Sequence, residues 1–207
     1  MNPPETKVYR LSNLADRDRA EILRALKNAH TAVLPTDTVY GLVTSAGAKT
    51  ALLRLNKIKN NPQSKPAQIL CNMQQAARMA QINKNFIKLS ALWPGALTLV
   101  AKSSAHGAMV LGGASTVGLR VPDDDFILGL MDELDSPFFA SSANLHGQSV
   151  CESEEQVLKT FRGLAEIIVL NGDIKNQPSC VVDVSKAEPV IIRKGGLSEK
   201  AIKKLLK

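Results

Sequence analysis

The sequence has 207 residues, of which 44% are hydrophobic and 22% are charged. These proportions match those of folded globular proteins and exclude disordered, collagen-like and fibrous classes. The length suits one domain with a substantial core, and no stretch resembles a linker. We therefore expect a single domain over residues 1–207, with no separate C-terminal domain.

The formal net charge is +7 at pH 7. A basic surface attracts polyanions in a salt-dependent way, so nucleic acid is one expected class of partner. The alternative is that lysine-rich faces only keep the protein soluble. In residues 200–207 the lysines alternate with apolar residues at helical spacing, which favours that alternative for this segment.

Membrane spans and disulfides are not expected. No apolar run approaches the roughly 20 residues that a span needs, and the start of the chain lacks a charged segment followed by a hydrophobic one. We therefore expect a cytoplasmic protein that does not contact membranes. Cys71, Cys151 and Cys180 are odd in number, lie far apart and lack zinc-site spacing, so we expect reduced, structural cysteines.

Helix and strand patterns alternate along most of the chain. Apolar residues recur at helical spacing in some segments, and short β-branched runs indicate strands between them. The expected helices are 16–28, 49–58, 73–80, 85–92, 125–134 and 153–161, followed by a last helix after residue 196. The expected strands are 31–34, 67–71, 96–101, 116–121, 137–140, 166–170, 181–184 and 189–193. Residues 35–42, 60–66 and 103–115 are expected to be loops. The alternation predicts an α/β fold with a twisted, mixed sheet flanked by helices.

Two short stretches carry the polar groups most indicative of a ligand. Lys57 and Lys59 are two residues apart, so on a strand or in a tight loop their ammonium groups meet an anion from one side. Ser142 and Asn144 have the same spacing and offer a hydroxyl and an amide that orient such an anion. Together the four residues indicate one nucleotide site.

Other polar residues lie at the ends of the predicted strands or in the loops after them. Arg120 is at the end of an apolar strand, where it requires a partner: either a ligand anion or a carboxylate among residues 123–125. The loop that contains Thr36 is either a binding loop or an ordinary turn. The pattern predicts a cationic, hydroxyl-rich cleft for an anionic small molecule. The candidate residues are Thr36, Lys57, Lys59, Lys65, Arg120, Ser142, Asn144, Ser179 and Arg193.

Several familiar catalytic patterns are absent from the sequence. It contains no Walker loop, no GxGxxG after a strand, no GxSxG elbow and no HExxH. The three histidines are scattered, and none has a cysteine or carboxylate at metal-ligand spacing. We therefore expect no metal held by protein side chains, and no residue is assigned as a general acid or base.

Seven motifs resemble, in order and spacing, those of the YrdC-like family, the threonylcarbamoyl-AMP synthases. The resemblance runs from about residue 32 to residue 195, which is nearly the whole chain. The motifs are residues 35–42 (PTDTVYGL), 57–66 (KIKNNPQSKP), 93–98 (WPGALT), 118–122 (GLRVP), 142–144 (SAN), 178–183 (PSCVVD) and 192–195 (IRKG).

The resemblance implies a YrdC/RibB-like fold in its short, single-domain form. It also implies that L-threonine, bicarbonate and ATP, with Mg²⁺ bound to the ATP, give threonylcarbamoyl-AMP and pyrophosphate for threonylcarbamoyladenosine modification of tRNA. A downstream threonylcarbamoyl transferase and tRNA or double-stranded RNA are the implied partners. Carried over by position, the nucleotide-binding residues are Lys57, Lys59, Lys65, Ser142, Asn144 and Arg193. The implied threonine pocket is Thr36, Arg120 and Ser179.

Lys59 departs from the family pattern, which usually has arginine at this position. Lysine keeps the charge but loses the bidentate fork, so phosphate binding differs. This substitution and the basic charge motivate an alternative, a YrdC-like paralogue that binds tRNA or rRNA through a basic concave face without synthesis. A third reading is a carbamoyl-transfer module such as those in hydrogenase-maturation proteins. It requires zinc-finger and acylphosphatase-like neighbours, for which this chain has no room.

Overall fold

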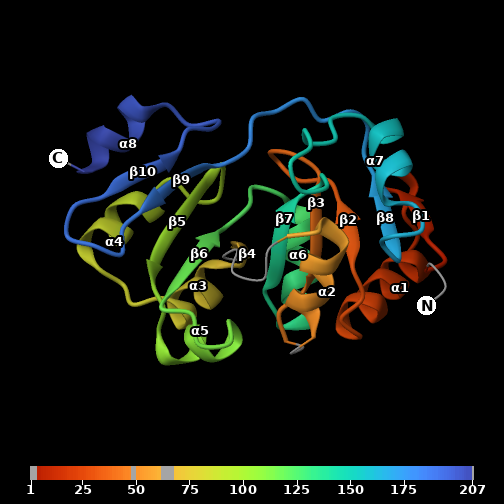
Figure 1. The fold of residues 1–207 in the computed structure, drawn as a ribbon, viewed down its shortest axis with the longest axis horizontal. Helices are drawn as coiled ribbons and strands as arrows, with labels where there is room; N and C mark the ends of the chain where they lie inside the picture. Colours follow the sequence, from red (N-terminus) through yellow and green to blue (C-terminus); the bar gives the residue numbers. More distant parts are fainter. Residues whose placement is uncertain (1–3, 48–49, 62–67, 207) are drawn as a thin grey trace.

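The computed structural model describes residues 4–47, 50–61 and 68–206, through which one ten-stranded sheet runs (Figure 1). Its order is β1-β8-β2-β3-β7-β4-β6-β5-β9-β10, with parallel and antiparallel neighbours. The expected mixed α/β sheet is therefore confirmed. The strands are β1 (Lys7–Arg10), β2 (Ala32–Leu34), β3 (Gly41–Ser45), β4 (Gln68–Leu70), β5 (Leu97–Lys102), β6 (Thr116–Arg120), β7 (Phe138–Ser142), β8 (Ile167–Leu170), β9 (Cys180–Asp183) and β10 (Val190–Arg193).

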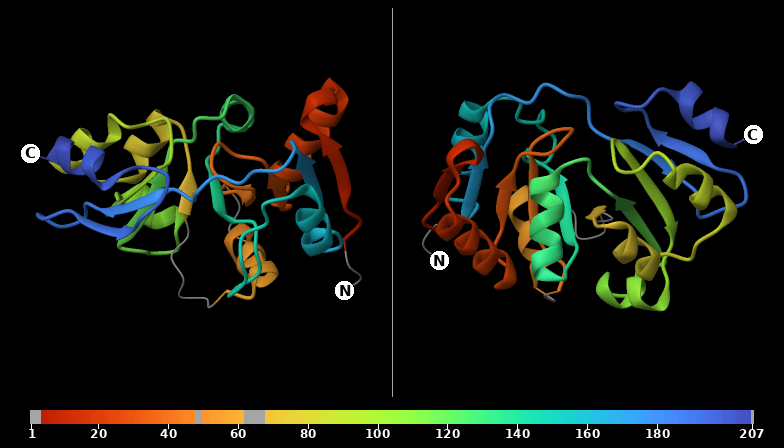
Figure 2. Two further views of the ribbon diagram at one scale, coloured as in Figure 1. Left: turned by 90° about the horizontal axis from the view of Figure 1, so that it is seen from above. Right: turned by 180° about the vertical axis from the view of Figure 1, so that it is seen from behind.

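Helices cover the two faces of the sheet unequally. On one face α1 (Asp16–Lys27) and α6 (Asp125–Leu134) pack their apolar stripes against β8, β2, β3, β7 and β4. The larger apolar cluster lies on the other face, under most of the remaining helices (Figure 2). These are α2 (Ala51–Lys59), α3 (Met73–Met79), α4 (Lys84–Ser90), α5 (Ala105–Val110), α7 (Glu154–Phe161) and α8 (Glu199–Leu206); a short 3-10 turn, η1 (Leu11–Asn13), follows β1. Within the described ranges, none of the helices has the length and apolar character to cross a bilayer.

Local signals in the sequence explain where several helices begin. The expected helix 125–134 is confirmed, and the Asp124 carboxylate accepts a hydrogen bond from the Ile127 amide at 2.9 Å, which caps its first turn. A capping box precedes α7: Ser153 Oγ accepts from the Gln156 amide at 3.2 Å, and Gln156 Oε1 accepts from the Ser153 amide at 3.4 Å. Both caps satisfy amides that a helix leaves unpaired at its start.

The structure corrects two of the expected loops. Residues 35–42 do not remain a loop to their end, because Gly41 begins β3, which pairs antiparallel with β2. Residues 103–115 contain α5, which Ser104 caps by accepting from the Gly107 amide at 3.0 Å. A Cβ at Gly107 would lie 2.1 Å from the Met79 carbonyl oxygen, so the glycine that suggested a loop is what lets α5 pack against α3. The edge strand β1 was not predicted.

All three cysteines are buried and unpaired, as expected from their spacing. Burial raises the pKa of the Cys71 thiol to about 12 and also raises the pKa of Cys151 and Cys180. The thiolate is the reactive form of cysteine. The three side chains therefore act as apolar packing groups at neutral pH.

Thr44 in β3 provides a test of core packing. Its side chain is fully buried, and Oγ1 has no hydrogen-bond partner among the described residues. A buried, unpaired hydroxyl costs about 1–3 kcal/mol. We expect Thr44→Val, which keeps the shape, to raise the free energy of unfolding by about 1 kcal/mol in urea denaturation.

The matched control for this prediction is Thr31→Val. Thr31 is also fully buried, but its hydroxyl donates to Glu166 Oε2 at 2.8 Å. Removing it leaves the carboxylate short of a donor, so this variant is expected to be less stable than the wild type. Equal changes in both variants would contradict the assignment of Thr44 as the unpaired group.

Candidate functional site

A pocket of about 260 Å³ lies beside the central strands β3, β7, β4 and β6, and residues just before β9 and at the end of β10 complete its lining. Leu70 and Ala140 line it and also belong to the apolar cluster under α1 and α6, which places the pocket on that face of the sheet. Among the described residues, no aspartate or glutamate lines it. Its polar lining side chains are Thr36, Thr38, Gln68, Arg120, Ser141, Ser142, Ser179 and Arg193.

The structure brings together five of the nine candidate residues from the sequence. The five come from separate segments of the chain and lie at strand ends or beside them. Lys57, Lys59 and Asn144 do not line the pocket, and Lys65 lies outside the described residues. The lining therefore has two guanidinium groups and several hydroxyls, a set that favours anionic ligands. The five are Thr36, Arg120, Ser142, Ser179 and Arg193.

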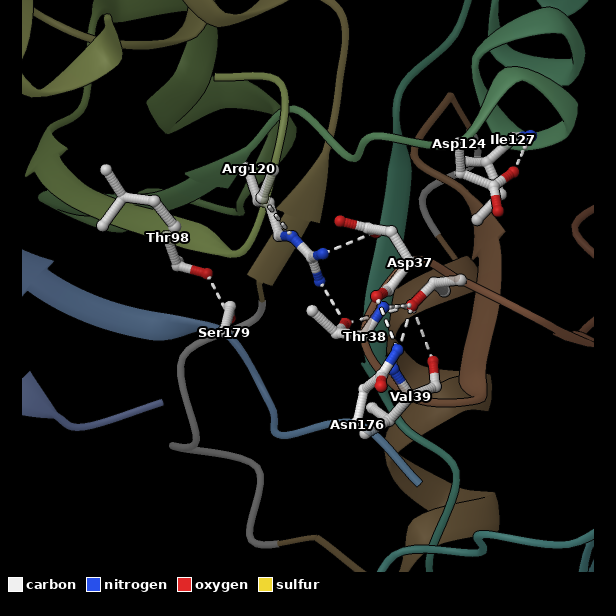
Figure 3. Close-up of polar contacts among 12 residues, drawn as sticks. Asp37, Thr38, Val39, Thr98, Arg120, Asp124, Ile127, Asn176 and Ser179 are labelled. Carbon is white, nitrogen blue, oxygen red and sulfur yellow. Dashed lines mark hydrogen bonds and ion pairs between the residues drawn. The ribbon is translucent and has the colours of Figure 1, made fainter. Parts of the chain in front are cut away.

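Arg120 is buried, with 4% of its surface exposed, and its guanidinium holds three segments together (Figure 3). Nη2 donates to Asp37 Oδ1 at 2.6 Å, Nη1 to Thr38 Oγ1 at 2.7 Å, and Nε to the Gly95 carbonyl oxygen at 3.0 Å. Three of its five N–H groups are thus used within the described residues. Two remain to meet a ligand in the pocket.

The partner of Arg120 differs from the structural alternative that the sequence suggested. No carboxylate among residues 123–125 pairs with it; Asp37 does. Asp124 instead caps α6, and burial raises the pKa of its carboxyl group, opposed by the hydrogen bond from the Ile127 amide. For Arg120 itself, burial lowers the pKa of the guanidinium and the Asp37 charge raises it. Arginine remains charged at neutral pH, so the pocket keeps this cation.

The hydroxyl of Thr36 organises the turn that supplies these partners. Thr36 Oγ1 accepts from the amides of Thr38 and Val39 at 3.1 and 3.2 Å and lies 2.7 Å from the Val39 carbonyl oxygen, to which it donates. Such side-chain bonds to the backbone fix a tight turn. The Asn176 side chain donates to the Asp37 carbonyl oxygen at 3.2 Å and fastens the turn from outside.

A close approach of two backbone segments fixes Ser179 and Arg193. Arg193 donates through Nε and Nη2 to the Ser179 carbonyl oxygen at 3.1 and 2.9 Å, and through Nη2 to Ser179 Oγ at 3.1 Å. A Cβ at Gly195 would lie 2.2 Å from the Pro178 carbonyl oxygen and 2.5 Å from the Cys180 amide. Any side chain at position 195 would therefore displace the segment that carries Ser179.

The geometry expected for Lys57 and Lys59 is wrong. Both lie in the last turn of α2 rather than on a strand or in a tight loop, and residues two apart on a helix differ by about 200° around its axis. Lys57 is exposed, whereas Lys59 is 1% exposed and donates through Nζ to Asn144 Oδ1 at 2.9 Å and to the Ser142 carbonyl oxygen. Ser142 Oγ donates to Asn144 Oδ1 at 2.6 Å. The two stretches therefore meet through Lys59 alone.

Four residues of the site are not among the candidates from the sequence: Asp37, Thr38, Gln68 and Ser141. Asp37 and Thr38 follow the motif threonine and bind Arg120, a long-range contact that local pattern does not show. Gln68 begins β4 and lines the pocket. A polar residue at the start of an otherwise apolar strand was the available signal for it.

The Asp37–Arg120 pair gives a second test. Removing one partner of a buried ion pair leaves an uncompensated charge, which costs about 3–5 kcal/mol. We expect Asp37→Ala to lower the free energy of unfolding by about that amount, and Asp37→Asn, which keeps a hydrogen-bond acceptor, to lower it less. Chemical denaturation measures both.

The matched control is Glu133→Ala, which removes the partner of Arg19 in an exposed ion pair. Exposed pairs contribute less than about 1 kcal/mol, so this variant should stay near the wild type. A loss for Asp37→Ala no larger than that of the control would show that Asp37 does not hold Arg120.

One family model and several relatives match most of this chain. The family model Sua5_yciO_yrdC, described as "Telomere recombination", matches residues 24–195. The threonylcarbamoyl-AMP synthase of Pyrococcus abyssi is 33% identical over 177 residues, which are 83% of this chain and 52% of that protein. The threonylcarbamoyl-AMP synthase of Vibrio vulnificus is 30% identical over 183 residues, 84% of this chain and 97% of that protein. The chain thus spans about half the length of the archaeal relative and nearly all of the bacterial one.

Solved structures agree with this match. Sua5 of P. abyssi complexed with L-threonine superposes with a TM-score of 0.90 at 29% identity, covering 97% of this chain and 61% of that one. Escherichia coli YciO superposes with a TM-score of 0.85 at 20% identity, covering 95% of this chain and 99% of that one, a likeness that shows the fold alone. The YrdC-like fold expected from the seven motifs is confirmed.

Proposed function

The chain belongs to the Sua5, YciO and YrdC family, and on that basis we propose that it is an L-threonylcarbamoyladenylate synthase. The proposed reaction converts L-threonine, bicarbonate and ATP into threonylcarbamoyl-AMP and pyrophosphate. The observation that carries the proposal is the pocket, where two guanidinium groups and five hydroxyls converge without a lining carboxylate among the described residues. Relatives at 33% and 30% identity that are named threonylcarbamoyl-AMP synthases support it.

The chemistry of the proposed reaction requires such a pocket. The carbamate of threonine is a weak, anionic nucleophile, and its oxygen attacks the anionic α-phosphate of ATP while the bond to the departing pyrophosphate breaks. Two anions must therefore be held in line with their repulsion cancelled. Fixed cations do this without reorganisation during the reaction.

We assign the threonine end of the pocket to Thr36, Arg120 and Ser179. Arg120 has two N–H groups that no described residue uses, which suits the carboxylate of an amino acid. Thr36 shapes the turn at its side, with its hydroxyl bonded to the backbone. Ser179 lines the opposite wall beside Arg193.

We assign the nucleotide to the neighbouring part of the site. Arg193 and Ser142 line the pocket and reach the phosphates directly in this proposal. The motif residues Lys57 and Lys65 are proposed as further cations. Lys59 contributes by holding the Ser142 to Asn144 turn, to which it donates two hydrogen bonds. A single ammonium group can fill this role, so lysine at position 59 does not need the bidentate geometry of arginine.

Magnesium is proposed to arrive with ATP. The described residues contain no group of three or more histidine, cysteine, aspartate or glutamate side chains that could hold a metal ion. Mg²⁺ in nucleotide enzymes is commonly bound through substrate phosphates with few protein ligands. The adenylate formed is a reactive mixed anhydride, so we propose that a threonylcarbamoyl transferase receives it and modifies tRNA.

Pyrophosphate release from ATP tests the function. With bicarbonate present we expect release that depends on L-threonine and is weaker with L-serine. Arg193→Met is expected to lower the rate roughly tenfold or more, because a charge-assisted hydrogen bond to an anion contributes about 1.5–3 kcal/mol.

The matched control is Arg78→Met, which removes the same charge from an exposed position on α3. It should leave the rate unchanged. Release that is independent of threonine, or equal losses in the two variants, would contradict the proposal.

A second candidate is an RNA-binding paralogue without synthase activity. The observations that favour it are the net charge of +7 and lysine in place of the usual arginine at position 59. This candidate predicts no pyrophosphate release, and tRNA binding that weakens steeply between two salt concentrations. Threonine-dependent release with weak tRNA binding would exclude it.

A further inference from the structure

Four side chains form a row of hydrogen bonds along one wall of the pocket. Gln68 Nε2 donates to Thr98 Oγ1 at 3.1 Å. Thr98 Oγ1 lies 2.8 Å from Ser179 Oγ (Figure 3). Arg193 Nη2 donates to Ser179 Oγ at 3.1 Å. Two hydroxyls are thus enclosed between a donor at each end. Gln68, Ser179 and Arg193 line the pocket, whereas Thr98 lies behind them, 3% exposed.

The protons in this row can be counted. Each hydroxyl has one proton to donate and two lone pairs to accept with. The end donors occupy one lone pair on each hydroxyl, and the bond between the hydroxyls uses one of their two protons. One proton is therefore left without an acceptor among the described residues.

Contact with the pocket decides which hydroxyl keeps the spare proton, because Thr98 and Ser179 are both 3% exposed and only Ser179 lines the pocket. If Ser179 donated to Thr98, the spare proton would lie on Thr98, behind the pocket wall, where no described residue accepts it. A buried donor without a partner is unfavourable. If Thr98 donates to Ser179, the spare proton lies on a side chain that lines the pocket, where a ligand can accept it.

We propose that Gln68 and Thr98 are positioning residues that fix the Ser179 hydroxyl as a hydrogen-bond donor toward an anionic oxygen of the ligand. The inference rests on the proposed function, and it adds the direction of the hydrogen bond between Ser179 and the ligand, which the proposed function does not specify. Both lone pairs of Ser179 are occupied, by Thr98 and by Arg193, so this point of the wall rejects ammonium and other donors. The shared ligand chemistry is an anionic oxygen, belonging either to the amino acid carboxylate or to a phosphate of ATP.

Reversing the row is the sharpest test. In Gln68→Glu the ionised carboxylate can only accept, so Thr98 turns its proton toward position 68 and Ser179 turns its proton toward Thr98. We expect the dissociation constant of the ligand at Ser179 to rise about tenfold. Gln68→Met removes the end donor without reversing the row and should stay within about threefold of the wild type. Lowering the pH until Glu at position 68 is protonated should restore binding.

A double-mutant cycle separates this effect from simple charge repulsion. Thr98→Val breaks the row, so Gln68→Glu added to it retains only the repulsion. We expect Gln68→Glu to raise the dissociation constant by a smaller factor in the Thr98→Val background than in the wild type. Thr98→Ser, which keeps the hydroxyl, should restore binding, and Thr44→Val controls for loss of a buried threonine hydroxyl elsewhere. Equal factors in the two backgrounds overturn the proposal.

Titration calorimetry with L-threonine and, separately, with ATP identifies the source of the anionic oxygen. We expect Gln68→Glu, which reverses the row, to weaken binding of one ligand and to leave the affinity for the other within about twofold of the wild type. Binding of neither ligand by folded wild-type protein contradicts the proposed function. In that case the row is judged in the free protein by NMR: a slowly exchanging Thr98 hydroxyl proton supports it, and fast exchange there with slow exchange at Ser179 overturns it.

Discussion

The buried ion pair between Arg120 and Asp37 is the contact on which the site depends. Its guanidinium joins the end of β6, the turn after β2 and the Gly95 carbonyl group, three segments far apart in the chain. Because Asp37 neutralises one edge of the cation, Arg120 can be buried at a tolerable cost. Arg120 lines a pocket that has no lining carboxylate among the described residues, so the contact that stabilises the fold also places a buried cation in the pocket wall.

The topology explains why these segments meet. The segment between β8 and β9 carries the chain from the second to the ninth position of the sheet (Figures 1 and 2). Its end, at Pro178 and Ser179, lines the pocket. On the way Asn176 fastens the turn that contains Asp37, and Ser179 enters the opposite wall. The pocket therefore forms only when the strands on the β3 and β7 side and those on the β9 and β10 side are both in place. Any binding in the pocket thus depends on the folding of the whole sheet.

Much of the fold was predictable from the sequence because its signals are local. Apolar periodicity located α6 and α7 closely, and the caps at Asp124 and Ser153 fix where these helices begin. What failed depends on contacts distant in sequence: β3 exists through pairing with β2 and β7, and Asp37 finds Arg120 across the sheet. The expected lysine pair failed for a local reason, since α2 extends through Lys59 and separates the two ammonium groups. Five of the nine candidate residues line one pocket, but the sequence did not show the bonds between them.

Identification of the product tests the proposed synthase activity directly. The protein is incubated with ATP, Mg²⁺, L-threonine and ¹³C-labelled bicarbonate, and the nucleotide products are separated and weighed by mass spectrometry. We expect an adenylate that contains threonine and one labelled carbon, formed in step with pyrophosphate and absent without threonine. Unlabelled AMP or ADP alone, from folded protein that binds ATP, would contradict it.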